Sequence, residues 1–237
     1  MPPPDQKEEY VRTMFGQIAA RYDLMNRIMT LGRDQAWRRY AIEQASIPDE
    51  GWVLDVATGT GDLAVEARRA HPEAKVVGID LVAEMLAVAR KKTLELNRAL
   101  PLLSGDALRL PFADSTFHAV VTAFAMRNVV DIPAAFAEMA RVSRPGARVV
   151  CLEIAKPKLP VFRRVYGFYF YRLVPLLGRW IAGQRSAYTY LPHSLTAFLT
   201  PDEIADVMRE VVWRQVQYRR MMLGTVAVHT GTKAPGT

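Results

Sequence analysis

Two closely spaced glycines carry the clearest chemical signal in this chain of 237 residues. They lie in the segment Val53-Leu-Asp-Val-Ala-Thr-Gly-Thr-Gly-Asp62, directly after an apolar stretch that is typical of a buried strand. Glycines at such a point let the backbone turn sharply and approach a ligand closely, as in nucleotide-binding strand–turn–helix units. We therefore expect a cofactor-binding loop, formed by Asp55, Thr58, Gly59, Thr60 and Gly61.

An acidic residue follows the next predicted strand. Asp80 ends that strand about twenty residues after the loop, where doubly wound folds place an acid that accepts hydrogen bonds from ribose hydroxyls. The loop and the acid together predict a site for an adenosine-type cofactor, with Leu81 and Ala123 lining it. The alternative interpretation is a tight turn with a surface aspartate.

Two cofactors fit this pattern, NAD and S-adenosylmethionine. The third position of the dinucleotide fingerprint is Ala64, which that fingerprint tolerates. Asp62 favours a cationic sulfonium compound, because an acid after the loop would repel a pyrophosphate. Asp106 and Ala107 resemble the adenine-contacting segment of class I methyltransferases, in which the acid accepts from the adenine amino group and the small residue leaves room for the ring. The alternative interpretation of Asp106 is a cap of a helix or a turn.

Strands and helices alternate through the middle of the chain, which predicts βαβ units and a parallel sheet. We expect strands at 52–57, 75–80, 102–103, 117–123 and 148–154, and helices at 62–70, 82–96 and 132–142. A turn is predicted at 143–147.

The flanking segments complete one predicted domain over residues 1–237. Residues 7–46 have the spacing of N-terminal helices, and Thr200 can cap a helix that continues to Met208. A closing strand pair is expected at 216–218 and 225–230. The segment 158–199 is rich in aromatic residues, arginine and proline, and we expect it to form a helical lid.

The composition limits the partners and the compartment. The net charge of +7 and the pI near 9.7 suit an acidic partner, either anionic lipid or nucleic acid, and the chain has no nucleic-acid-binding motif to accompany the charge. The alternative interpretation of the charge is a solvated basic surface. Cys151 is the single cysteine, so no internal disulfide and no multi-cysteine metal site can form, which fits a reducing cytoplasm. The first residues lack a signal-peptide pattern, and arginines interrupt the most apolar stretch, so no transmembrane helix is expected. The oligomeric state is left open, a homo-oligomer included.

Several segments, in order along the chain, resemble the UbiE/MenG family of quinone C-methyltransferases. The N-terminal signature contains Tyr-Asp-x-Met-Asn before a tryptophan, and an Arg-Asn pair follows the predicted fourth strand; both are more specific than the glycine loop. The matching segments are Phe15–Asn26 with Trp37–Arg39, Phe124–Val129, Arg141–Pro157, Ser186–Leu191 and Gly224–Gly231.

Four positions depart from the family pattern. Asp34 stands in place of a usual histidine, so that histidine cannot be essential in this chain. Thr30 stands in place of a serine, and Ala147 in place of a second glycine after Pro145. Val212 and Trp213 stand where a Gly-Phe turn is common, which puts the last helix–strand corner in doubt.

The resemblance implies a class I methyltransferase fold and methyl transfer from S-adenosylmethionine to a ring carbon of a polyprenylated quinol, with S-adenosylhomocysteine as product. It favours conversion of demethylmenaquinol to menaquinol, and a ubiquinone-precursor benzoquinol is the alternative acceptor. The ring pocket should lie above the carboxyl ends of the strands, which Arg127 and Asn128 reach after the fourth strand and Glu153 at the end of the fifth. Tyr22, Asp23 and Asn26 would come from the N-terminal helices, folded over the cofactor.

Arg127 would stabilise the quinol oxyanion, but it cannot be the base, because it stays protonated. A water held by Arg127 and Asn128, or a carboxylate, could accept the proton, and His193 and His229 are further candidates. Alternatively, Arg127 forms an ion pair with Asp131 or Glu153. No metal is required.

Two other functions stay open. One is a class I methyltransferase that acts on a soluble small molecule, and the other is a catalytically silent cofactor-binding scaffold. For a polyprenyl acceptor, the lid would contact the inner face of the cytoplasmic membrane transiently, with its aromatic residues at the headgroups. Its arginines would bind anionic lipid, namely Arg163, Arg164, Arg172, Arg179 and Arg185. Alternatively, the aromatic residues pack over the sheet and cover the cofactor.

Overall fold

A seven-stranded sheet forms the centre of the computed structural model, which describes residues 6–96, 99–159, 164, 166–177, 190, 194–196 and 198–235. The strand order is β3-β2-β1-β4-β5-β7-β6, in which β7 is antiparallel to both of its neighbours and the other pairs are parallel. The mostly parallel sheet is thus confirmed. Its strands are β1 (Trp52–Val56), β2 (Lys75–Asp80), β3 (Leu102–Ser104), β4 (Phe117–Ala123), β5 (Ser143–Ile154), β6 (Trp213–Met221) and β7 (Val226–Lys233).

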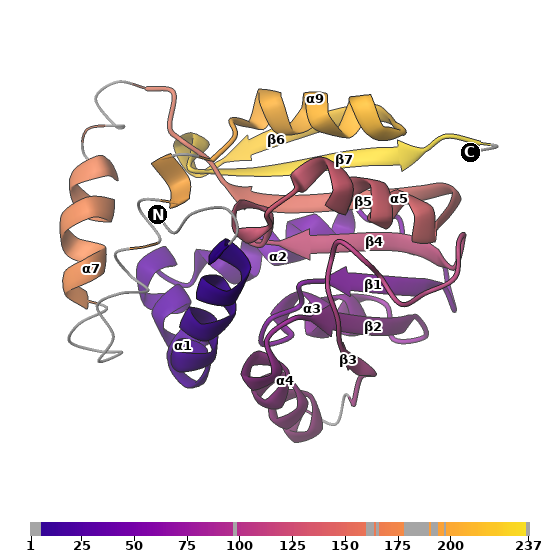
Figure 1. Ribbon diagram of the computed structural model, residues 1–237, viewed down its shortest axis with the longest axis horizontal. Helices are drawn as coiled ribbons and strands as arrows, with labels where there is room; N and C mark the ends of the chain where they lie inside the picture. The colour runs from indigo at the N-terminus through magenta and orange to yellow at the C-terminus, as the bar shows by residue number, and fades with distance from the viewer. Residues whose placement is uncertain are drawn as a thin grey trace.

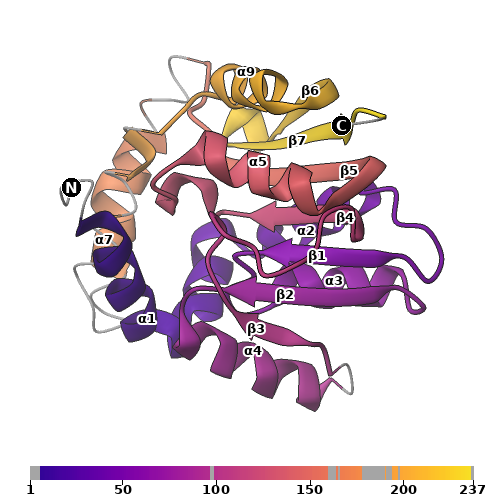
Figure 2. The same cartoon turned by 45° about the vertical axis from the view of Figure 1, so that its right-hand side comes forward.

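Helices cover both faces and one end of this sheet. Helices α2 (Arg33–Glu43) and α3 (Asp62–Ala70) pack on one face, while α5 (Ile132–Val142) and α9 (Pro201–Val211) pack on the other. Helix α4 (Ala83–Glu95) contacts β3 and α1 (Lys7–Thr30). In Figures 1 and 2, α1 and α7 (Val174–Leu177) stand at the end toward which β1 and β4 point.

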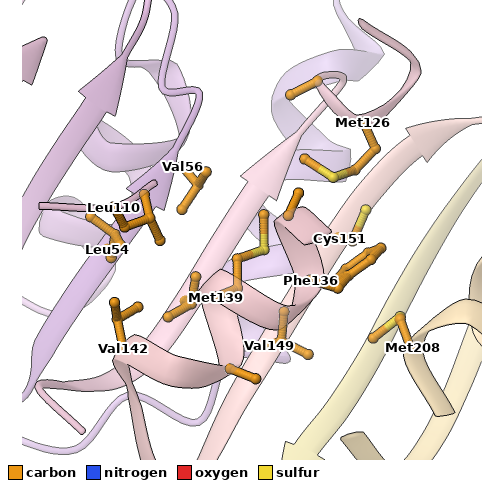
Figure 3. Packing of buried hydrophobic residues seen from close by; sticks show 14 of the residues in the cluster. Leu54, Val56, Leu110, Met126, Phe136, Met139, Val142, Val149, Cys151 and Met208 are labelled. Carbon is orange, nitrogen blue, oxygen red and sulfur yellow. The ribbon is translucent and has the colours of Figure 1, made fainter. Parts of the chain in front are cut away.

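The central strands are apolar on both faces because both faces are covered. Along β1, Leu54 and Val56 belong to the cluster under α5 and α9, whereas Val53 belongs to the cluster under α2 and α3. Figure 3 shows the first cluster, in which Phe136 and Met139 of α5 lie over β4 and β5. Cys151 is buried in this core, and burial raises the pKa of its thiol.

Local signals set the starts of α5 and α9. The Asp131 side chain accepts a hydrogen bond from the amide of Ala134 at 2.9 Å, so that one of the free N–H groups of the first turn is satisfied. At α9, Thr200 and Glu203 form a reciprocal capping box, with Pro201 at the first helical position. The prediction of a helix that Thr200 caps is confirmed, and the helix runs three residues beyond Met208.

Two expected boundaries are wrong. The predicted turn at 143–147 lies inside β5, which begins at Ser143 and contains a register shift opposite β4, with Gly146 at a φ of +80°. The last strand pair is longer than predicted, because β6 begins at Trp213 and pairs along most of β7. The N-terminal helical segment divides into α1 and α2 at Leu31 and Gly32, both with positive φ.

The predicted lid at 158–199 is described only in part. The described portion holds the π-helical turn η3 (Tyr169–Leu173) and α7, and it contacts α1 through a hydrogen bond of 2.8 Å from the Tyr169 hydroxyl to the Met29 carbonyl. His193, Arg163, Arg179 and Arg185 lie outside the described residues. Within the described ranges, no helix has the length and apolar character needed to cross a membrane.

Lys92 connects α1 to the residue after the glycine loop through two ion pairs. The Nζ of Lys92 on α4 lies 2.5 Å from a carboxylate oxygen of Asp23 on α1 and 2.5 Å from one of Asp62 at the start of α3. Asp23 also accepts a 2.5 Å hydrogen bond from the hydroxyl of Thr60. Burial alone would raise the pKa of Asp62, but attraction to Arg38 and Lys92 outweighs burial and lowers it.

Replacing Lys92 with methionine should destabilise this corner, because Asp23 and Asp62 then lose the cation that they share, and Arg38 stays beside Asp62 at 3.8 Å. We expect Lys92→Met to lose about 1–3 kcal/mol of unfolding free energy, between the values for surface and buried pairs. The matched control is Lys91→Met, since Lys91 is 80% exposed and its ion-pair distance to Glu95 is 3.9 Å. Urea unfolding of both variants measures the difference, and equal losses would contradict the prediction.

The pH dependence gives a second readout of the same cluster. The pKa of Asp62 is lowered in the fold, so the stabilisation it provides is complete at neutral pH and is lost as the pH falls through that lowered pKa. The stability gap between wild type and Lys92→Met should therefore persist through neutral pH and narrow only in strong acid.

Candidate active site

A cavity opens at the carboxyl ends of β1, β2 and β4, where the strand order reverses. This first cavity has an empty volume of about 850 Å³, with the open solvent at its mouth included, and lies between the sheet and α1. Ligands of doubly wound folds bind at such a reversal point, because the loops on either side diverge. The residues around it include Phe15, Tyr22, Ala57, Gly59, Asp80, Leu81, Met85, Asp106, Ala107, Ala123, Phe124 and Asn128.

The glycine loop borders this cavity with its backbone. Gly59 and Gly61 have φ values of +57° and +82°, which residues with a Cβ rarely adopt. A Cβ on Gly59 would meet nothing within 4 Å, so the dihedral angle rather than crowding requires glycine there. Beneath the loop, Asp55 accepts from the hydroxyl of Thr58 at 2.6 Å and from the amide of Ala64 at 3.0 Å. Burial raises the pKa of Asp55 to about 7.

Asp80 lies across the loop. Its carboxylate accepts from the amide of Gly59 at 2.7 Å and from the amide of Val82 at 2.8 Å. Burial raises the pKa of Asp80, while these backbone donors act in the opposite direction. Two amides therefore fix the orientation of the carboxylate, and lone pairs on both oxygens remain for a ligand.

Asp106 is oriented in the same way after β3. One of its carboxylate oxygens accepts from the amide of Leu108 at 2.9 Å, and its carbonyl accepts from the amide of Arg109. Ala107 lies next to it on the cavity wall, and Ala123 at the end of β4 lines the same cavity. The pair of a fixed carboxylate and a small residue leaves room for a flat ring with a hydrogen-bond donor.

Six of the ten expected cofactor residues line the first cavity: Gly59, Asp80, Leu81, Asp106, Ala107 and Ala123. The other four, Asp55, Thr58, Thr60 and Gly61, are in or under the loop and hold its shape. The argument from Asp62 against a dinucleotide is wrong, because Lys92 and Arg38 neutralise that carboxylate.

A second cavity of about 1250 Å³ adjoins the first. Tyr22 and Phe124 line both cavities, so the two meet at these side chains. Its walls are mostly apolar and come from α1, α2, β7 and the η3 segment. The lining comprises Tyr22, Asn26, Met29, Thr30, Leu31, Asp34, Trp37, Phe124, Arg127, Ile154, Tyr166, Tyr169, Met222, Thr225 and Val226.

Phe124 lies between the two cavities and has a strained backbone. Its φ of +59° is energetically costly for an aromatic residue. Strained residues of this kind cluster at functional sites. The surrounding structure fixes the ring: Trp37 makes an edge contact at a centroid distance of 6.4 Å, and the Arg38 guanidinium lies 5.3 Å from its centroid. The position of this wall is therefore set by α2.

Arg127 lies on the short helix η2 (Met126–Asn128) and is buried. Its Nη1 lies 3.3 Å from Glu153 Oε2 and also donates to the carbonyl of Phe124. Burial raises the pKa of Glu153, against the attraction of Arg127. The ion pair with Glu153 that the sequence offered as an alternative is therefore present, and Arg127 still reaches the wall of the second cavity.

The remaining expected catalytic residues are divided among several places. Tyr22 borders both cavities, Asn26 borders the second and Asn128 the first. Asp23 and Glu153 are not among the residues that line either cavity; Asp23 binds Lys92 and Glu153 binds Arg127. His229 is also buried away from both, with its Nε2 2.9 Å from the Pro201 carbonyl, and burial lowers its pKa to about 4.

Sequence reasoning missed the apolar second cavity. Its walls combine α1, α2, β7 and η5 (Met222–Gly224), which are far apart along the chain. Trp37 and Phe124 were available only as members of a resembling segment, and Met29 and Met222 carried no signal. Asp34 was noted only as a departure from a pattern, although it is a buried carboxylate on this wall.

Comparison with known proteins agrees with this geometry. A model of the ubiE/COQ5 methyltransferase family matches residues 4–233. The chain is 48% identical over 233 residues to a demethylmenaquinone methyltransferase of Roseiflexus castenholzii, covering 98% of this chain and 97% of that protein. It is 43% identical over 223 residues to a ubiquinone/menaquinone biosynthesis C-methyltransferase of Desulfotalea psychrophila, covering 94% and 90%.

A solved structure supports the fold alone. A Thermotoga maritima SAM-dependent methyltransferase, described as a possible histamine N-methyltransferase, superposes with a TM-score of 0.66 at 19% identity and covers 94% of this chain and 99% of that one. The chain thus has the class I S-adenosylmethionine-dependent methyltransferase fold and belongs to the ubiE/COQ5 methyltransferase family.

Proposed function

We propose that this chain transfers the methyl group of S-adenosylmethionine to a ring carbon of a polyprenylated quinol, converting demethylmenaquinol to menaquinol. The observation that carries the proposal is the junction of a polar and an apolar cavity at Tyr22 and Phe124. A methyl donor on one side and an apolar acceptor on the other would meet there in line, which is the main requirement of methyl transfer. The names of relatives, at up to 48% identity, support the same acceptor.

The first cavity suits S-adenosylmethionine. Asp80 would accept from the ribose hydroxyls, and Asp106 from the adenine amino group, while Leu81 and Ala107 would pack on the ring. The backbone of Gly59 comes close enough to admit the amino-acid end. When bound, the cofactor supplies an electrophilic methyl group on a cationic sulfur.

The second cavity suits the quinol. Its apolar walls would hold the ring and the first part of the prenyl chain, and Arg127 would face the ring oxygen that becomes negative. Glu153 would keep the guanidinium oriented from behind. The benzoquinol acceptor stays an alternative, since a similar protein is named for both quinone pathways.

The rim of the second cavity suits a membrane surface. Leu31, at 85% exposure, and Leu223, at 62%, belong to two distant segments, and both have positive φ. Leu31 and Met222 line the cavity, so this exposed apolar rim lies at its mouth. With the net charge of +7, it would let a lipid-embedded acceptor pass from an anionic bilayer into the cavity. This rim adds described residues to the membrane contact that was expected of 158–199.

Cofactor binding tests the first cavity. Asp80→Ala should raise the dissociation constant for S-adenosylmethionine at least about tenfold, because each hydrogen bond to a charged acceptor contributes about 1.5–3 kcal/mol. The exposed Asp49→Ala is the control and should bind as wild type does. Calorimetry on folded protein measures both constants, and an unchanged value for Asp80→Ala would refute the assignment.

Turnover tests Arg127. We expect Arg127→Ala to lower kcat by about 10²–10³, the usual effect of one oxyanion stabiliser, with little change in cofactor affinity. Arg127→Lys keeps the charge beside Glu153 and should recover part of the rate. Rates with demethylmenaquinol and calorimetric affinities should be compared; a parallel loss of both quantities would mean that Arg127 only supports the fold.

Liposome flotation tests the rim. Wild type should float with vesicles that contain anionic lipid, less so at high salt, and the double variant Leu31→Ser/Leu223→Ser should float less. Leu94→Ser is the matched control, because Leu94 is 64% exposed on α4 and does not line either cavity. Equal flotation of all three proteins, or equal recovery on neutral vesicles, would contradict the proposed surface.

A further inference from the structure

Asp34 is a buried carboxylate that takes no part in the contacts proposed for the cofactor or for the oxyanion. It lies in the first turn of α2, is 1% exposed and lines the second cavity. The hydroxyl of Thr30 lies 2.9 Å from its Oδ1 and 2.8 Å from the carbonyl of Asn26, and its single hydrogen is shared between these two acceptors. A carboxylate in an apolar wall is costly to bury unless it has hydrogen-bond partners. The one side-chain partner that the described residues give Asp34 is Thr30.

Charge is scarce on this wall. Among the described residues that line the second cavity, Asp34 and Arg127 are the only members of the Asp, Glu, Lys and Arg types. Arg127 is already paired with Glu153, and it cannot accept a proton. Among the described lining residues, Asp34 is therefore the one carboxyl group that an apolar ligand would meet in this cavity.

The other titratable groups among the lining residues that the structure describes are phenols. Burial raises the pKa of Tyr166 and of Tyr169, so both stay protonated in the neutral range. Tyr22 is the third, at the junction of the cavities. Glu153 lies behind Arg127, and His229 is buried away from both cavities, so neither contacts a ligand there.

We propose that Asp34 is the general base that accepts the hydroxyl proton of the quinol. This inference rests on the proposed function and names a residue for its missing step. The O–H bond of the quinol breaks, and its proton moves to a carboxylate oxygen of Asp34. The electron pair left on oxygen makes the adjacent ring carbon nucleophilic.

The rest of the reaction then balances. The ring carbon forms a bond to the methyl carbon while the sulfur–methyl bond breaks, and that electron pair stays on sulfur as S-adenosylhomocysteine. The ring carbon then loses its hydrogen as a proton, and the oxygen regains one as aromaticity returns. One proton is released overall, through Asp34 to water.

The sharpest test replaces one oxygen of the carboxylate. Asp34→Asn keeps the shape and can still accept from Thr30, so the fold should hold. We expect kcat with demethylmenaquinol to fall by about 10²–10⁴, the usual contribution of a general base, while the affinity for S-adenosylmethionine stays that of wild type. The control is Glu43→Gln, since Glu43 is exposed at the other end of α2.

The pH profile separates a base from a structural residue. Turnover by Asp34→Asn should rise steeply with pH, because a growing fraction of already ionised quinol needs no base, and the gap to wild type should narrow accordingly. A purely structural role would lower kcat in proportion to the folded fraction at every pH, and that outcome would overturn the inference.

Two further outcomes are distinguishable. If wild type methylates the quinol and Asp34→Asn is equally active, the inference fails and the proposed function stands. If wild type binds S-adenosylmethionine but does not methylate the quinol, the proposed function fails and the inference fails with it.

Discussion

The placement of α1 over the end of the sheet is the constraint on which both cavities depend. Residues of α1 line the first cavity through Phe15 and Tyr22 and the second through Asn26 and Met29. Lys92 fixes this helix by binding carboxylates of α1 and α3 together, directly beside the glycine loop. If α1 moved, the cofactor wall and the acceptor wall would both open, because one helix supplies part of each.

Burial determines what the charged groups of the site can do. Arg127 and Glu153 are nearly inaccessible, and each would be costly alone, so their pairing at 3.3 Å makes a fixed cation tolerable beside an apolar cavity. A cation held in this way stabilises an anionic intermediate more strongly than a cation in water does, since little reorganisation is needed. Burial acts in the same way on Asp34, a carboxylate whose side-chain hydrogen-bond donor is the hydroxyl of Thr30.

Much of the fold follows from local sequence signals. The periodic strands and helices from 52 to 142 match the structure closely, because apolar alternation, glycine turns and caps act over a few residues. The glycine loop, Asp80 and Asp106 were also predictable, since parallel strands bring their carboxyl ends to one edge whatever the rest of the chain does. The limits of β5 and β6 were not, because a register shift inside β5 and the pairing of β6 with β7 depend on neighbouring strands.

The sequence by itself determined that this chain has a parallel α/β sheet with a cofactor loop and two acids at its edge. Only the tertiary structure decided which charged side chains form ion pairs within the fold and which of them line a cavity where a ligand can bind. Asp23 and Asp62 look like site residues in the sequence, yet Lys92 and Arg38 bind them. Asp34 looks like a mere departure from a pattern, yet it lines the acceptor cavity. The physical reason is that an ion pair or a cavity wall joins residues from separate elements, and no short stretch of sequence contains both partners.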